Sequence, residues 1–205
     1  MKFNLIAAAT LMAASVSAQA AVITTSLDSV AGATVIGFET FDGFVNTNGG
    51  VNLGQGVSLG ADTDAELSPA VRDLGTNGAW TFGLNGFAAA GTNGSLYFTF
   101  DSLRSGVSAF VSHDGGSSLL VEAFGVGGVL LESATVTFTS SLGAESYDEG
   151  TTIGFLRNST DIQSLRITGA GAVVDNIAAV PEPTSLALLA AALGVVGFAA
   201  RRRQA

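Results

Sequence analysis

The chain carries few residues that could act as nucleophiles or bind a transition metal. It has no cysteine, which excludes cysteine nucleophiles and thiolate zinc sites, and its single histidine is His113. A serine triad would have to use this histidine, and no G-x-S-x-G turn is present. The surrounding SHDGGSS is typical of a solvated loop between two strands. These features argue against catalysis by a serine or cysteine nucleophile.

Carboxylates are the abundant reactive groups. Between Asp28 and Asp175 the chain holds 16 acidic residues and only four arginines, a net charge of about −12 for this part. Such a surface repels phosphate backbones, so nucleic acid is excluded as a partner. It suits divalent cations such as calcium, which prefers oxygen ligands, or simply solubility. A glycosidase would need one pair of carboxylates, and nothing in the sequence singles out a pair.

Two stretches contain candidate ligand-binding residues. ADTDAELS places Asp62, Asp64 and Glu66 at alternating positions, like the start of an EF-hand loop. Leu67 stands where that loop needs glycine, so a solvated acidic loop is the simpler interpretation, with calcium ligation as the alternative. Trp80, in GAWTFGL, is either a platform on which a sugar stacks or an aromatic residue of the core.

The elements that must position these residues are β-strands. In SLYFTFD, Leu96, Phe98 and Phe100 alternate with Tyr97 and Thr99, which is the period of a half-buried strand. The same pattern predicts strands in SGVSAFVS, SLLVEAF, VLLESATVTF, TIGFL, SLRITG and AVVDNI, with a hairpin at GVGG. Tight turns are expected at four Asn-Gly pairs, which begin at Asn48, Asn77, Asn85 and Asn93. Many short strands predict an all-β, antiparallel β-sandwich of the jelly-roll type; a β-solenoid would need a fixed repeat period, and none is present.

The amino end has the features of a secretory signal peptide. Lys2 is followed by the apolar stretch Leu5–Val16, and Ala18 and Ala20 fit the small-x-small cleavage pattern. We therefore expect residues 1–20 to be a signal helix that is removed on export. An exported chain without cysteine gains no disulfide stability, so the body at residues 21–180 must rely on its core.

Residues 181–205 differ in composition from the body. Pro181, Glu182 and Pro183 are expected to form an extended segment, because proline excludes helix there. Leu186–Ala200 is an uncharged run at the short limit for a transmembrane helix. A basic cluster then fixes the cytoplasmic end by the positive-inside rule. The cluster consists of Arg201, Arg202 and Arg203.

This order of VPEP, a short apolar helix and a terminal RRR resembles the PEP-CTERM sorting signal of Gram-negative bacteria. The resemblance implies recognition by an exosortase, a membrane cysteine protease or transpeptidase, and an association with exopolysaccharide and the biofilm matrix. It also implies transient anchoring in the inner membrane before release to the cell surface or extracellular matrix.

The two ends of the body, VIGFETFDGF and AVVDNI, are similar to those of other PEP-CTERM proteins, many of which resemble carbohydrate-binding sandwiches. If the first and last strands pair, Glu39, Asp42 and Asp175 come close together, where several carbohydrate-binding jelly rolls hold a structural calcium. Because no catalytic constellation is recognisable, we expect a non-catalytic surface or matrix protein that is retained with exopolysaccharide and binds sugar. The alternative is an extracellular hydrolase with a carboxylate pair.

Calcium binding can be tested by thermal melting of the purified body in millimolar calcium and in chelator. Extracellular modules bind calcium with dissociation constants of roughly 10⁻⁴ to 10⁻³ M, and a ligand that binds only the folded state raises the midpoint. We expect a higher midpoint in calcium and no calcium-dependent shift in Asp175→Ala. Equal midpoints for the wild-type body would contradict the prediction.

Overall fold

The computed structural model describes residues 21–38, 40–41, 43–45, 50–62, 65–68, 87–90, 94–113, 118–138, 150–169 and 171–181. The predicted signal helix and membrane helix lie outside these residues, as do the asparagines of the four Asn-Gly pairs.

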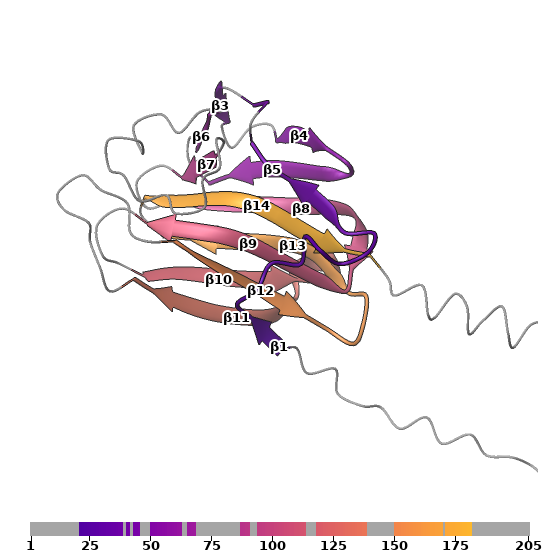
Figure 1. The fold of residues 1–205 in the computed structure, drawn as a ribbon. Coiled ribbons are helices and arrows are strands. Elements are labelled where there is room, and N and C mark those ends of the chain that lie inside the picture. Colours follow the sequence, from indigo (N-terminus) through magenta and orange to yellow (C-terminus); the bar gives the residue numbers. More distant parts are fainter. Residues whose placement is uncertain are drawn as a thin grey trace, which may run out of the picture.

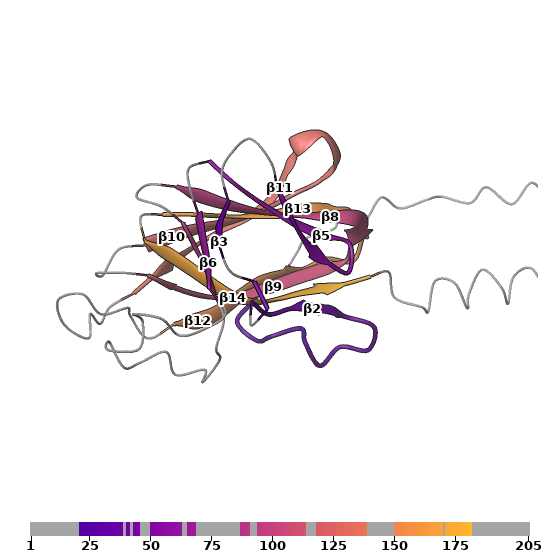
Figure 2. The same cartoon turned by 90° about the horizontal axis from the view of Figure 1, so that it is seen from above.

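The described residues form strands of two antiparallel sheets, which Figure 2 shows as two layers. The eight-stranded sheet has the order β1-β12-β9-β14-β7-β6-β3, with β2 also paired to β14. The six-stranded sheet has the order β11-β10-β13-β8-β5-β4. The predicted all-β antiparallel sandwich is therefore confirmed (Figure 1).

The strands of the eight-stranded sheet are β1 (Ala21–Ile23), β2 (Thr34–Ile36), β3 (Gly43–Val45), β6 (Ala65–Ser68), β7 (Phe87–Ala90), β9 (Gly106–His113), β12 (Thr151–Leu156) and β14 (Ala172–Val180). Those of the six-stranded sheet are β4 (Val51–Gly54), β5 (Val57–Ala61), β8 (Ser95–Arg104), β10 (Ser118–Phe124), β11 (Leu130–Thr137) and β13 (Ile162–Thr168).

Alternating burial produces the core between the sheets. On β8, Leu96, Phe98 and Phe100 are buried, whereas Thr99 between them is exposed. β10 and β13 follow the same period, because alternate residues of a strand point to opposite faces of its sheet. The six-stranded sheet thus has one apolar inner face and one outer face rich in polar side chains.

β9 and β14 are buried on both faces, which a simple two-layer sandwich does not explain. The segment between β1 and β2, residues 24–33, runs over the outer face of the eight-stranded sheet beside β14 (Figure 2). Its Leu27 packs with Ala178 and Val180 in a second, small apolar cluster. The Leu27 backbone N–H also donates to Ser108 Oγ at 3.0 Å. We call residues 24–33 the strap.

Of two hairpin turns in the six-stranded sheet, the sequence predicts one and does not predict the other. The GVGG turn joins β10 to β11 as expected, with Gly127 and Gly128 at positive φ. The β4–β5 hairpin turns instead at Gly54, Gln55 and Gly56, all at positive φ and without an Asn-Gly pair.

A substitution at Gly154 tests how closely the backbones of β12 and β9 approach each other. A Cβ at this position would lie 2.2 Å from the Val107 carbonyl oxygen and 2.7 Å from Ser108 Cα. We expect Gly154→Ala to lower the free energy of unfolding by about 1–3 kcal/mol, the usual cost of overpacking. Gly60→Ala is the control, because a Cβ there meets nothing within 4 Å. Equal stabilities of the two variants in urea unfolding would contradict this account.

Candidate functional site

A row of polar side chains crosses the outer face of the six-stranded sheet. Strand register places Tyr97 of β8 opposite Arg166 of β13, and Arg166 opposite Glu122 of β10. Neighbouring strands lie about 4.8 Å apart, so directly opposed side chains are within contact distance. We call Tyr97, Arg166, Glu122 and the adjacent Phe124 the central row.

Arg166 holds the central row together. Its Nε donates to Glu122 Oε2 at 2.8 Å, and its Nη2 donates to the same oxygen. The guanidinium carbon lies 4.9 Å from the centre of the Phe124 ring and 6.0 Å from that of Tyr97. Hydrogen bonding to Glu122 raises the pKa of Arg166, so the arginine stays charged. The Glu122 side chain is 9% exposed and that of Arg166 31%, so the arginine is the more accessible partner.

Tyr97 extends the row to β5. Its hydroxyl donates a hydrogen bond of 2.5 Å to Oδ1 of Asp62, the residue that follows β5. Burial raises the pKa of the Tyr97 hydroxyl above its ordinary value of 10.0, and the hydrogen bond to Asp62 raises it further. The phenol therefore remains protonated at neutral pH, and its position is fixed by the carboxylate. Beside it, Ser95 Oγ and Thr168 Oγ1 share a hydrogen bond of 2.8 Å.

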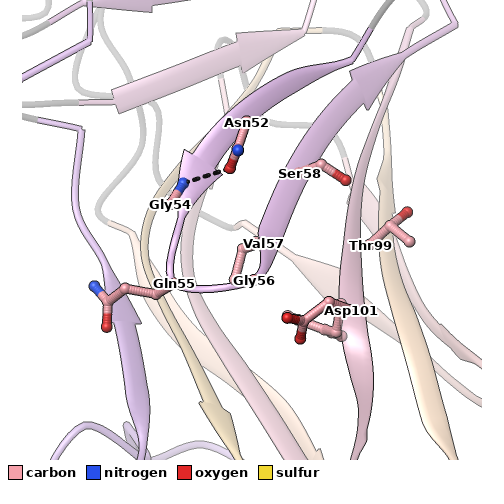
Figure 3. Close-up of a pocket in the computed structure, with 9 residues that line it drawn as sticks. Asn52, Gly54, Gln55, Gly56, Val57, Ser58, Thr99 and Asp101 are labelled. Carbon is pink, nitrogen blue, oxygen red and sulfur yellow. Dashed lines mark hydrogen bonds between the residues drawn. The ribbon is translucent and has the colours of Figure 1, made fainter.

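A hollow of about 480 Å³ adjoins the row along β8. Asn52, Ser58 and Thr99 line it, and register places these three side by side on β4, β5 and β8. Thr99 is two residues from Tyr97 on the same strand, so the hollow and the central row share one face. Figure 3 shows Ser58, Thr99 and Asp101 beside the β4–β5 turn.

The turn is held by its contact with β8. The Asp101 N–H donates to the Gly56 carbonyl at 2.8 Å, and a Cβ at Gly56 would lie 2.3 Å from the Asp101 carboxylate. Only glycine fits here, and its φ of +76° also favours glycine. Gln55 points away from Asp101 in Figure 3 and donates through Nε2 to the Val35 carbonyl at 3.1 Å. The turn thus links the two sheets.

The face combines aromatic rings with planar hydrogen-bonding groups. A ring gives apolar contact and C–H packing to the face of a sugar, while carboxylate, guanidinium and hydroxyl groups fix the orientation of its hydroxyls. Within the described residues no three acidic or histidine side chains are grouped to hold a metal ion. Rings and paired polar groups in this arrangement are suited to contact with a polar, ring-containing ligand.

The predicted calcium ligands are only partly described. β2, at the start of VIGFETFDGF, pairs with β14, whereas the first strand of the body, β1, pairs with β12 and not with the last strand. Asp175 is fully buried at an irregularity in β14, and its Oδ1 accepts a hydrogen bond from the Asn176 N–H at 2.6 Å. Glu39 and Asp42 lie outside the described residues, so calcium binding stays a prediction.

Of the other predicted site residues, the structure describes some and not the rest. Asp62 is exposed and bonded to Tyr97, and His113 ends β9 before the expected loop. Glu66 lies in β6, so the interpretation of the whole acidic stretch as a loop is wrong at that residue, which pairs with Phe44 of β3. Pro181 directly follows β14. Outside the described residues lie Ala18, Ala20, Asp64, Trp80, Glu182, Pro183, Arg201, Arg202 and Arg203.

The sequence did not single out the central row. Tyr97 lies in SLYFTFD and Arg166 in SLRITG, and the strand period alone places each on the polar face. Which residue of one strand faces which residue of another depends on register. The sequence signal that could have pointed to these residues is that two strands with clear alternation carry an aromatic residue and an arginine at outward-facing positions.

Comparison with protein families gives a match at the carboxy end. The model for the PEP-CTERM protein-sorting motif matches residues 179–203. The chain carries a PEP-CTERM sorting signal. This confirms the resemblance seen in VPEP and the terminal arginines, and it marks the protein for export, exosortase processing and sorting to the cell surface. In the part of the chain that the structure describes, no helix is long and apolar enough to cross a membrane.

Solved structures share the sandwich at low identity. The CsCBM6-3 module of Clostridium stercorarium, solved with cellobiose, is 14% identical with a TM-score of 0.35, covering 73% of this chain and 94% of its own. A module of Cellvibrio mixtus lichenase 5A, solved with cellotriose, is 12% identical with a TM-score of 0.35, covering 73% and 98%. The K1 adhesin domain of the Porphyromonas gingivalis Lys-gingipain is 11% identical with a TM-score of 0.44, covering 74% and 99%.

At these identities and TM-scores no ligand or binding site can be transferred to the PEP-CTERM chain. A search of curated proteins gave no match.

The environment of Tyr97 predicts its titration. The chain has two tyrosines, so in Tyr147→Phe the phenolate absorbance reports Tyr97 alone. We expect a midpoint above 10.0, lowered in the additional variant Asp62→Ala, which leaves the burial but removes the carboxylate. Because the folded-state pKa is raised, the stability that this group contributes is present below pH 10 and is lost as the pH rises through the folded value. A midpoint at or below 10.0 would contradict the raised pKa, and an unchanged midpoint in Asp62→Ala would contradict the contact with Asp62.

Proposed function

We propose that this exported protein is a non-catalytic component of the cell surface or extracellular matrix, retained with exopolysaccharide and binding neutral carbohydrate through the central row. The sorting signal supplies the route of export. The observation that carries the binding proposal is the arrangement of Tyr97, Arg166, Glu122 and Phe124 in one row on the outer face of the six-stranded sheet.

The charges of the face support a neutral ligand. Arg166 is the one cation of the central row, and Glu122 already neutralises it. Asp62 and Asp101 lie near the row and the hollow, and the whole chain has a formal charge of −9. An anionic polysaccharide would be repelled from this surface. Sugar hydroxyls, which both donate and accept hydrogen bonds, match a row of paired carboxylate, guanidinium and phenol groups.

The same contacts support binding without turnover. A glycosidase needs one carboxyl that delivers a proton and a second that attacks or activates water. On this face Glu122 is bonded to Arg166, Asp62 to Tyr97 and Asp101 to Arg104, so each of these carboxylates is engaged. An extracellular hydrolase remains the second candidate, and release of reducing ends from a bound glycan would favour it.

Titration calorimetry of the purified body with neutral and uronic-acid oligosaccharides tests the proposal. We expect binding of a neutral ligand, weakened at least tenfold by Tyr97→Ala, which corresponds to about 1.4 kcal/mol. Arg166→Lys keeps the charge but loses the planar fork, and should also weaken binding. Thr137→Ala is the matched control, since Thr137 is an exposed residue on β11 of the same sheet, outside the row.

Two results would overturn this assignment. One is the absence of binding across a panel of neutral glycans. The other is an unchanged dissociation constant in Tyr97→Ala when the melting temperature shows that the variant is folded.

A further inference from the structure

The first residue of the sorting motif's proline pair is bonded to the folded body. β14 ends at Val180 and continues into Pro181 without a linker. Ser105, between β8 and β9, donates its backbone N–H to the Val180 carbonyl at 2.9 Å and its Oγ to the Pro181 carbonyl at 2.8 Å. Ser105 is only 3% exposed, so water competes little for these hydrogen bonds. We call Ser105, Val180 and Pro181 the clasp.

Neighbouring elements hold the clasp from two sides. The Ser105 carbonyl accepts a hydrogen bond from the Arg157 N–H at 2.8 Å, which ties it to the end of β12. Val180 packs against the strap residue Leu27 in the small apolar cluster. A Cβ on Gly32 of the strap would lie 3.7 Å from Pro181 Cγ, so the strap lies against the proline ring. The clasp is thus part of the folded body rather than of a free tail.

Proteolysis makes demands that the clasp opposes. A cysteine protease attacks a carbonyl carbon with its thiolate, forms a thioester as the C–N bond breaks, and transfers a proton to the leaving amine. Water or an acceptor amine then releases the acyl group. During both steps the carbonyl oxygen must enter an oxyanion hole. The carbonyls of Val180 and Pro181 are instead occupied by Ser105.

We propose that the folded body protects the Val180–Pro181 and Pro181–Glu182 bonds, and that processing cuts the chain at the Glu182–Pro183 bond or beyond. The mature protein then keeps Pro181 and the whole clasp. Processing in this position removes the sorting tail without breaking a contact of β14. This inference does not depend on carbohydrate binding.

A post-proline endopeptidase tests the protection within one molecule. Two of its cleavage positions are close together, after Pro181 and after Pro183. We expect the detergent-solubilised full chain to be cut after Pro183 and not after Pro181, as read by intact mass spectrometry. A synthetic peptide of residues 176–190, which has no body, should be cut at both. Equal rates at the two positions in the folded chain would overturn the proposal.

Ser105→Ala removes the hydroxyl that holds the Pro181 carbonyl. We expect cleavage after Pro181 to rise about fivefold, the effect on a local opening equilibrium of losing one hydrogen bond of ordinary net strength. Ser102→Ala is the matched control, because its Oγ bonds Asp101 and does not touch the tail. Melting temperatures of both variants separate local opening from global unfolding. An unchanged rate in folded Ser105→Ala would contradict protection of the Pro181 carbonyl by the Ser105 hydroxyl.

The carboxy terminus of the protein processed in its own cell gives a second, independent measurement. A terminus at Glu182 or later supports the proposal. A terminus at Val180 or Pro181 overturns it, whatever the endopeptidase shows.

Discussion

β14 is the strand on which the rest of the sandwich depends, because it pairs with β2, β7 and β9. Strands far apart in the sequence are therefore held in one sheet by the last strand of the body. Its two faces are both buried, one in the main core and the other partly under the strap. The eight-stranded sheet cannot be completed until residues 172–180 are in place, and the match to the sorting motif begins within them, at residue 179.

Because β14 completes the sheet, its direct continuation into Pro181 has a physical consequence. A tail joined by a flexible spacer could be handled independently of the body. Here the strand that completes the sheet also carries the first residues matched by the sorting motif, which begins at residue 179. Ser105 extends the hydrogen bonding of the body as far as the Pro181 carbonyl. Folding of the body and presentation of the tail are consequently coupled through one short segment.

The arginines in the described part of the body are bonded to carboxylates. In the described part of the chain, Arg104 pairs with Asp101, Arg157 with Asp161 and Glu132, and Arg166 with Glu122. Arg157 links the turn between β12 and β13 to β11, whereas Arg166 lies on an open sheet face between two aromatic rings. The first arrangement ties a turn to the edge strand β11, whereas the second leaves the arginine partly exposed between two half-buried rings.

The sequence by itself determined the fold class, the seven strands from β8 to β14 and the sorting signal, because each rests on a local pattern. Period-two burial in SLYFTFD and the order of VPEP, apolar run and arginines can be recognised without knowing any neighbour. Only the tertiary structure decided that Tyr97, Arg166 and Glu122 share a row, that the strap covers β14, and that Ser105 holds Pro181. The Glu122–Arg166 and Ser105–Pro181 bonds join residues 44 and 76 positions apart, and the contact of Leu27 with Ala178 and Val180 spans more of the chain still. A strand's period fixes which face a side chain takes but not which side chain it meets there.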